Sequence, residues 1–305
     1  MKPSHRSRDD RRFPLARILV ASLVLACTAP PCVAQARAYR VEEGIVYSTA
    51  GGAELQLDVA WPAKGTGPFP LIIFLPGNGW GWWQYERRAT YYADIRETAK
   101  RGYVAAAVDY RSTSIKVEGK SRYPFPAQVQ DVKAAVRWLR MHAGDYSIDV
   151  DHVAAVGYSS GGHLALLLGF TDPRDGLAGD AADSSVSSAI QAVVSIAAPT
   201  ELAALYRESD TPQEVLTDLI GATPQERPDR YRQASPLTYI TMGDPPVLII
   251  HGDDDPMVPV SQALLLDQRM TEAGVPHQLI ILKGGKHENI PLNEDIWRFL
   301  ADHLR

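Results

Sequence analysis

Cysteine is nearly absent from this chain of 305 residues. The sequence contains only two, Cys27 and Cys32, and both fall within the first 36 residues. Residues 37–305 therefore cannot be cross-linked by disulfides and must be held together by a hydrophobic core. The length of residues 37–305 suits one large α/β domain.

A long apolar run and an excess of positive charge are also lacking. The apolar run Ile18–Ala26 has nine residues, whereas a membrane-spanning helix needs about 20. The formal net charge is −5, and residues 1–36 hold six of the 31 Lys and Arg residues but only two of the 36 Asp and Glu residues. Residues 37–305 thus carry −9, which argues against nucleic acid as a partner and needs no explanation beyond solubility.

The first 36 residues follow the order of features that is typical of an export signal. Basic residues, among them Arg11 and Arg12, precede Ile18–Ala26, and Ala34-Gln35-Ala36 fits an A-x-A cleavage site. We expect residues 1–36 to be a signal peptide and residues 37–305 to be a periplasmic or secreted domain. The paired arginines leave the twin-arginine route open, and Cys27 leaves a lipid anchor as the lesser alternative.

The most informative motif is G-x-S-x-G, formed by Gly157-Tyr158-Ser159-Ser160-Gly161. It follows the apolar strand-like run Val153–Val156 and precedes the helix-like run His163–Leu168. Glycines on either side of a serine allow a sharp strand-to-helix turn with an exposed hydroxyl, and the first N–H groups of the helix point at the same place. The motif predicts that Ser159 is a nucleophile. The plain alternative is a Gly-rich turn that only joins strand to helix.

A serine nucleophile needs a histidine base and a carboxylate that orients the histidine. On strand-turn-helix scaffolds the chain order is serine, acid, histidine. Asp255, at the far end of three aspartates after the strand-like run Val247–Ile250, is the predicted acid, and Asp253 is the fallback. His287, in the loop after Gln278–Leu282, is the predicted base. The aspartate run lacks the spaced oxygen ligands of a calcium loop, so neither a metal nor a cofactor is expected.

Three other histidines are weaker candidates for the base. His251 ends a strand, where a buried structural role is more common. His163 lies four residues beyond Ser159 and would point along the helix, and His277 precedes a strand without an evident partner.

The loop after the strand Leu71–Leu75 supplies the second part of the predicted oxyanion hole. We expect the backbone N–H of Asn78 or Gly79 to join that of Ser160, because small residues let backbone N–H groups approach an oxygen closely.

The same loop contains three tryptophans, Trp80, Trp82 and Trp83. They are expected either to line a substrate pocket or to pack the loop against the domain.

Strand-like and helix-like runs alternate along the rest of the chain. The predicted strands are Leu55–Ala60, Leu71–Leu75, Tyr103–Asp109, Val153–Val156, Ala192–Ala197, Val247–Ile250 and Gln278–Leu282. The predicted helices are Tyr85–Arg101, Ala127–Ala143, Val260–Ala273 and Ile296–Leu304. Mostly apolar strands indicate a parallel sheet covered on both faces, with ligands at the carboxyl ends of the strands. Only Leu55–Ala60 alternates, with Asp58 on its polar side.

Two segments break this alternation. Thr171–Ser188 is typical of a long loop, and Thr200–Ser235 is predicted to be an excursion from the fold. Thr211 begins a capping-box pattern that predicts a short helix, Pro212–Ile220. The excursion either covers the site or is a surface insertion without a role.

Taken together, the motifs make the chain resemble an α/β-hydrolase of the esterase/lipase type, close to the hormone-sensitive-lipase-like and bacterial feruloyl/acetyl-esterase groups. The resemblance extends from about Gly44 to Leu300. The segments that carry it are Leu57-Asp58-Val59, Gly77–Trp80, Asp109-Tyr110-Arg111, Phe125-Pro126-Ala127 with Asp131, Gly157–Ala165, Ala198–Leu202, Ser235-Pro236-Leu237, His251–Pro259 and Gly285–His287. It implies a mostly parallel eight-stranded sheet with helices on both faces and a short excursion over the site. It also implies that Ser159, Asp255 and His287 form a catalytic triad.

Two departures from the family pattern bear on the substrate. The oxyanion loop usually begins H-G-G-G, whereas this chain has Pro76-Gly77-Asn78-Gly79, and Lys286 replaces the more usual glycine before the base. The expected function is an exported serine esterase acting on short-chain or carbohydrate-linked (acetyl or feruloyl) esters. The alternatives are a peptidase with the same triad and a non-catalytic binding protein of the same fold.

Overall fold

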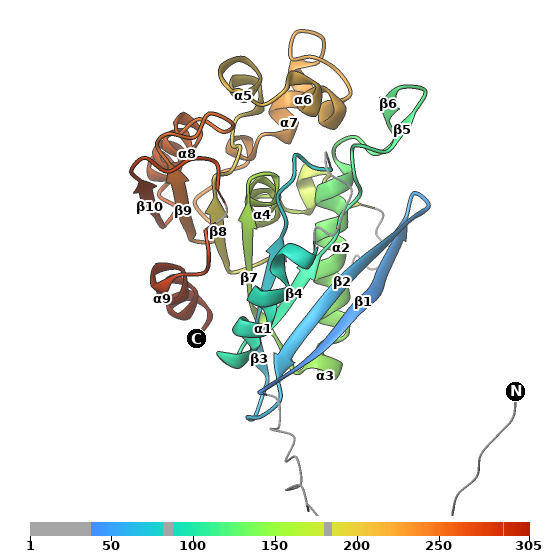
Figure 1. The fold of residues 1–305 in the computed structure, drawn as a ribbon, viewed down its shortest axis with the longest axis vertical. Helices are drawn as coiled ribbons and strands as arrows, with labels where there is room; N and C mark the ends of the chain where they lie inside the picture. The colour runs from blue at the N-terminus through green and yellow to red at the C-terminus, as the bar shows by residue number, and fades with distance from the viewer. Residues whose placement is uncertain (1–37, 82–87, 180–184, 289) are drawn as a thin grey trace, which may run out of the picture. The chain divides into compact units, whose positions relative to one another are not determined.

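The computed structural model describes residues 38–81, 88–179, 185–288 and 290–305. The expected signal peptide, residues 1–36, lies outside these ranges. A sheet of eight strands in the spatial order β1-β2-β4-β3-β7-β8-β9-β10 forms the centre of the fold (Figure 1). Its strands are β1 (Tyr39–Ala50), β2 (Ala53–Pro62), β3 (Phe69–Leu75), β4 (Val104–Val108), β7 (Ile148–Tyr158), β8 (Ala192–Ile196), β9 (Val247–Gly252) and β10 (His277–Leu282). The β1–β2 and β2–β4 pairs are antiparallel, and the other pairs are parallel.

All seven predicted strands are confirmed, and β1 is the strand of this sheet that the sequence pattern missed; it also missed the short separate hairpin of β5 (Lys116–Val117) and β6 (Lys120–Ser121). Its residues are mostly exposed or half-buried, and its register shifts between Glu42 and Ile45, so it shows no continuous apolar run. Pairing with β1 also corrects the prediction for Asp58. This side chain is fully buried and accepts a hydrogen bond from the N–H of Gly44 at 2.7 Å instead of facing solvent.

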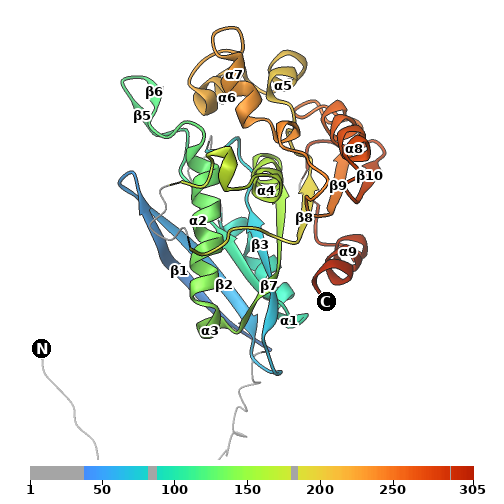
Figure 2. The same cartoon turned by 180° about the vertical axis from the view of Figure 1, so that it is seen from behind.

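Helices cover both faces of the sheet, as predicted (Figure 2). They are α1 (Tyr92–Lys100), α2 (Ala127–Met141), α3 (Ala143–Tyr146), α4 (Ser160–Phe170), α5 (Leu202–Glu208), α6 (Gln213–Ile220), α7 (Pro228–Ala234), α8 (Ser261–Ala273) and α9 (Glu294–Leu304), with 3₁₀ turns at Arg88–Tyr91, Pro173–Asp175 and Pro236–Thr238. In the described part of the predicted helix Tyr85–Arg101, the α-helix begins only at Tyr92, after the 3₁₀ turn.

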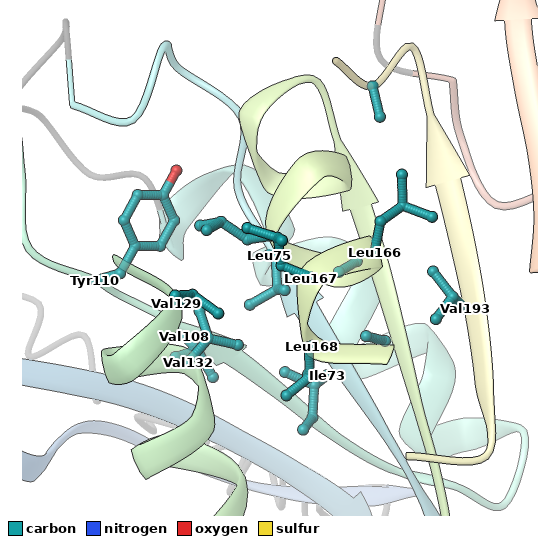
Figure 3. Packing of buried hydrophobic residues seen from close by; sticks show 14 of the residues in the cluster. Ile73, Leu75, Val108, Tyr110, Val129, Val132, Leu166, Leu167, Leu168 and Val193 are labelled. Atoms are coloured by element: carbon teal, nitrogen blue, oxygen red, sulfur yellow. The ribbon is translucent and has the colours of Figure 1, made fainter. Parts of the chain in front are cut away.

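The core consists of one apolar cluster on each face of the sheet. Successive residues of β3 alternate between the two clusters, with Ile72 and Phe74 facing α1 and α9, and Ile73 facing α2 and α4. Helix α4 packs on β7 and β8 beside α2, and Leu164–Leu168 are all at most 1% exposed (Figure 3). Burial of each such side chain contributes about 1.5–3 kcal/mol, so the helix that follows Ser159 is firmly held.

The excursion forms α5, α6 and α7 beyond the carboxyl ends of the parallel strands (Figure 1). Its two ends are joined, because the N–H of Leu202 donates to Oγ of Ser235 at 2.9 Å.

The helix predicted within the excursion is confirmed as α6, but the predicted capping box is wrong. The hydroxyl of Thr211 donates to the carbonyl oxygen of Met257 at 2.6 Å and makes no capping bond to α6.

The turn between β7 and α4 is possible only because backbones approach each other closely there. A Cβ on Gly161 would lie 1.9 Å from the carbonyl oxygen of Leu75, and one on Gly157 would lie 2.2 Å from the carbonyl oxygen of Gly161. Atoms that are not bonded cannot come so close, so a side chain at Gly161 would force α4 away from β3, and one at Gly157 would force β7 and α4 apart.

We therefore expect Gly161→Ala to destabilise the domain by about 4 kcal/mol or more, since the backbone of β3 or α4 must move. Gly144→Ala is the matched control, because a Cβ at Gly144 meets nothing within 4 Å. Thermal unfolding followed by circular dichroism measures both. Equal unfolding temperatures for the two variants would contradict the close approach.

Candidate active site

Ser159 occupies a strained turn between the end of β7 and the start of α4. Its backbone angles are φ 54° and ψ −124°, in the left-handed half of the map that residues other than glycine rarely adopt. Two hydrogen bonds hold it there: its N–H donates to Ile196 at 2.8 Å, and its carbonyl accepts from the N–H of His163 at 3.0 Å. The turn thus fixes the direction of the Ser159 hydroxyl.

The structure brings the three predicted triad residues together. His287 Nε2 lies 2.9 Å from Ser159 Oγ, and His287 Nδ1 lies 2.7 Å from Asp255 Oδ2. Asp255 comes from the loop after β9 and His287 from the loop after β10, so the parallel strands deliver both to the edge where β7 delivers Ser159. The result is a continuous chain of hydrogen bonds from a buried carboxylate to a serine hydroxyl.

The surroundings of Asp255 keep its carboxylate ionised. Burial alone would raise its pKa, but the contacts with His251 and His287 and the N–H of Val258 outweigh burial and hold the pKa well below its usual range. An ionised carboxylate only accepts hydrogen bonds, so Nδ1 of His287 carries the proton and donates to it. Nε2 of neutral His287 is then free to accept the proton of the Ser159 hydroxyl.

The three consecutive aspartates are in three different situations. Asp255 is buried and contacts His287, whereas Asp253 is exposed and accepts the N–H of Gly284 at 2.5 Å. Asp254 is exposed to solvent. Asp253, the alternative candidate for the acid, therefore holds the loop before His287 in place, whereas Asp255 is the residue that contacts the imidazole.

His251 and His277, two of the weaker candidates for the base, contact groups other than Ser159. His251 is buried beside the site, where Nε2 lies 2.7 Å from the carbonyl oxygen of Val258 and 3.5 Å from Asp255. The expectation that His277 has no partner is wrong, because its Nε2 lies 3.2 Å from Asp267.

The predicted oxyanion loop lies against the turn at Ser159. Asn78, Gly79 and Trp80 all have positive φ (126°, 55° and 57°), and the N–H of Gly81 closes the turn on the carbonyl of Asn78 at 3.0 Å. The hydroxyl of Tyr110 donates to the carbonyl of Pro76 at 2.7 Å and fixes the start of the loop.

The candidate oxyanion donors lie around one small cavity. Asn78, Gly79 and Ser160 line it together with Ser159 and His287. Ser160 is the first residue of α4, and the first N–H groups of a helix have no acceptor within the helix. Their partial positive charge is therefore available to a negatively charged oxygen in the cavity.

Trp80 is fixed by a hydrogen-bond chain that the sequence did not reveal. It is 2% exposed, and its indole N–H donates to Nδ1 of His163 at 3.0 Å. An indole only donates, so Nδ1 must accept and Nε2 must carry the proton, which it donates to the carbonyl of Ala234 at 2.8 Å. His163 thus connects the oxyanion loop, α4 and the excursion, and burial lowers its pKa to about 4.

The cavity beside Ser159 has a volume of about 200 Å³ and mostly apolar walls. The excursion supplies Leu205, Thr211, Pro212 and Val215, and the loop after β9 supplies Met257 and Val258. The excursion therefore lines the site and is not a remote insertion. Sequence reasoning missed these wall residues because nothing in a linear pattern shows which loops face each other. Trp80 is among the residues around the cavity, and its burial also fits the packing alternative, whereas Trp82 and Trp83 lie outside the described residues.

Comparison with known families matches residues 57–270 to the model of the BD-FAE family. The chain belongs to this family. The predicted resemblance to α/β-hydrolase esterases and the predicted fold class are thereby confirmed.

Individual relatives of this BD-FAE chain are esterases. Esterase LipC of Mycobacterium tuberculosis is 30% identical over 252 residues, which cover 80% of this chain and 58% of LipC. The chain spans about half the length of the curated relatives it matches. A truncated carbohydrate esterase from gut microbiota is similar in structure, with a TM-score of 0.71 and 28% identity over 83% of this chain and 91% of that one.

A second structural neighbour is Est2, an esterase of Thermogutta terrifontis, in its propionate-bound form. Its TM-score is 0.67 and its identity 26%, over 87% of this chain and 91% of Est2. Within the described ranges of the BD-FAE chain, no helix is long and apolar enough to cross a membrane.

The different surroundings of Asp255 and Asp253 lead to a prediction about catalysis. We expect Asp255→Asn to lower kcat about ten-thousandfold, because an amide cannot support the imidazolium or fix the His287 tautomer. Asp253→Asn should leave kcat nearly unchanged, since the amide oxygen still accepts the N–H of Gly284. Steady-state kinetics with p-nitrophenyl acetate distinguish the two. Similar losses in both variants would rule out the selective role of Asp255.

The buried His163 leads to a prediction about the pH dependence of stability. Its pKa of about 4 in the folded chain lies below the ordinary value of 6.5, so the unfolded chain binds more protons between these values. The stability that neutral His163 provides should be complete above about pH 6.5 and fall as the pH drops towards 4. His163→Gln can accept from Trp80 and donate to Ala234 without titrating.

Urea unfolding of wild type and His163→Gln at several pH values measures this effect, and other titrating groups cancel in the difference. The advantage of wild type should shrink as the pH falls from 7 to 4. A difference that stays constant across this range would show that His163 does not titrate as described.

Proposed function

We propose that this protein is an exported serine carboxylic ester hydrolase that works through an acyl-enzyme. The observation that carries the proposal is the hydrogen-bond chain Asp255–His287–Ser159, with distances of 2.7 and 2.9 Å. A carboxylate, an imidazole and a hydroxyl in this order allow the hydroxyl to become a nucleophile at neutral pH.

The first half of the reaction acylates Ser159. Its Oγ attacks the ester carbonyl carbon while Nε2 of His287 accepts the hydroxyl proton, and Asp255 stabilises the imidazolium. The carbonyl oxygen becomes an oxyanion that accepts hydrogen bonds from the N–H of Ser160 and from Asn78 or Gly79; each such donor contributes about 3–4 kcal/mol. The C–O bond to the alcohol then breaks, and the alcohol leaves with the proton from Nε2.

The second half returns the enzyme to its starting state. Water gives a proton to Nε2 of His287 and its oxygen attacks the acyl carbon. The bond to Ser159 Oγ breaks, Oγ takes the proton back from His287, and the carboxylic acid leaves. No group other than the triad and the backbone donors is required for this cycle.

The shape of the cavity favours a small acyl group. Its volume of about 200 Å³ and the side chains of Leu205, Val215 and Met257 suit an acetyl or similarly short chain. Two relatives support this substrate range: one neighbour is described as a carbohydrate esterase, and Est2 has been captured with propionate. Export rests on the features of residues 1–36, with residues 37–305 as the catalytic domain.

The proposal predicts that Ser159→Ala lowers kcat for p-nitrophenyl acetate about a millionfold, because no nucleophile remains. Ser48→Ala, on the distant edge strand β1, should retain full activity. A fluorophosphonate probe should label wild type at Ser159. An ester panel from acetyl to long-chain and feruloyl groups, with a peptide p-nitroanilide beside it, shows the range of substrates.

Three outcomes would count against the proposal. Equal activity of the Ser159→Ala variant and wild type would remove Ser159 from the mechanism. Preference for the anilide over every ester would indicate a peptidase. A folded wild type that neither hydrolyses esters nor reacts with the probe would be a binding protein on the same fold.

A further inference from the structure

His251 lies at the carboxyl end of β9, beside residues 255–258, which are called the acid loop below. Strands β8 and β10 flank β9, and His251 itself pairs with Ile281 of β10 (Figure 1). The side chain of His251 is only 1% exposed. A polar ring buried this deeply needs an acceptor for its N–H, and both acceptors near its Nε2 belong to the acid loop.

The first acceptor is the carbonyl oxygen of Val258, which lies 2.7 Å from Nε2 of His251. A carbonyl oxygen only accepts hydrogen bonds, so Nε2 carries the proton and donates it. The same nitrogen lies 3.5 Å from Oδ2 of Asp255, whose side chain is fully buried. This separation is longer than an ordinary hydrogen bond, but in a buried site it still gives attraction between a polarised N–H and a carboxylate.

Val258 connects the imidazole of His251 to the same carboxylate by a second route. Its N–H donates to Oδ1 of Asp255 at 2.9 Å, while its carbonyl accepts from His251. The N–H of Met257 donates to Oδ1 as well, also at 2.9 Å. His251 therefore fixes one end of the turn whose backbone N–H groups hold the carboxylate of Asp255.

The other carbonyls of the acid loop are held by the excursion. The N–H of Asp210 donates to the carbonyl of Pro256 at 2.8 Å, and the hydroxyl of Thr211 donates to that of Met257 at 2.6 Å. These two donors connect the loop to a segment outside the sheet. His251 instead connects it to β9, and thus to the sheet that also carries the nucleophile.

The orientation of the Asp255 carboxylate matters because the carboxylate orients the base. Its Oδ2 accepts the Nδ1–H of His287 at 2.7 Å, and Nε2 of the same ring lies 2.9 Å from Ser159 Oγ. A carboxylate that rotates or shifts would turn this ring and misalign Nε2 with the hydroxyl proton. Burial raises the pKa of the Asp255 carboxyl, and the contact with His251 is one of those that hold this pKa down.

From these contacts we propose that His251 is a positioning residue for catalysis. Through the Val258 peptide and through its own Nε2–H, it keeps the Asp255 carboxylate in the orientation that His287 requires. His251 does not line the cavity at Ser159, so it acts only through Asp255. The inference deepens the proposed acyl-enzyme mechanism and rests on it.

Two substitutions of similar length separate the N–H of His251 from its bulk. In His251→Gln the side-chain amide nitrogen reaches the position of Nε2 and can donate to the carbonyl of Val258, whereas His251→Met has no donor. His251→Met should lower kcat for p-nitrophenyl acetate about tenfold, and His251→Gln should stay within about threefold of wild type. The rate of labelling by the fluorophosphonate probe should fall in the same order.

A double-mutant cycle measures whether the loss passes through Asp255. In the Asp255→Asn background, His251→Met should lower kcat by no more than about twofold, because the carboxylate that His251 positions is already gone. A purely structural role would instead reduce the amount of folded enzyme, and hence the rate, by the same factor in both backgrounds.

His277→Met is the matched control, because it also removes a histidine that contacts an aspartate, Asp267, but at the start of β10. It should leave kcat unchanged. Equal kcat values for His251→Gln and His251→Met would overturn the positioning role, as would a tenfold loss that persists in the Asp255→Asn background. If Ser159→Ala retains wild-type activity, the proposed mechanism fails and the positioning role fails with it. In an enzyme that depends on Ser159, the first two outcomes overturn the positioning role alone.

Discussion

The close contact between the backbones of α4 and β3 is the constraint on which the site depends. Gly161 leaves no side chain where the carbonyl of Leu75 passes, and Gly157 leaves none where the backbone of Gly161 passes, so β7 can end and α4 can begin within one residue. That residue is Ser159, and the tightness of the turn is what forces its φ to 54°. Burial of α4 on nearly all sides supplies the energy that sustains this strained conformation.

The loop after β9 supplies both the carboxylate that contacts His287 and part of the cavity wall. Asp255 is buried, and the N–H groups of Met257 and Val258 both donate to its Oδ1 at 2.9 Å, which offsets the cost of burying the charge. Met257 and Val258 also form part of the cavity wall, and the carbonyl of Met257 accepts the hydroxyl of Thr211. The loop that contacts His287 therefore also positions the excursion beside the cavity. His163 makes the matching connection on the other side, between Trp80 and the excursion.

Chain order and apolar strands were enough to predict which residues meet, because parallel strands deliver their carboxyl ends to one edge of the sheet. Ser159, Asp255 and His287 come together for that reason. Features decided by contacts between distant segments could not be predicted. Asp58 is buried only because β1, an exposed strand without an apolar run, pairs beside it. Thr211 does not cap α6 because its hydroxyl donates to the carbonyl oxygen of Met257, in another loop.

The central claim is that Ser159 carries the acyl group between two half-reactions. The most direct measurement mixes the enzyme with p-nitrophenyl acetate, stops the reaction with acid within the first turnovers, and analyses the peptides by mass spectrometry. The account predicts one acetyl group on the peptide that contains Ser159, formed at the rate at which p-nitrophenol first appears. Turnover without acetylated Ser159, or an acetyl group on another residue, would contradict it.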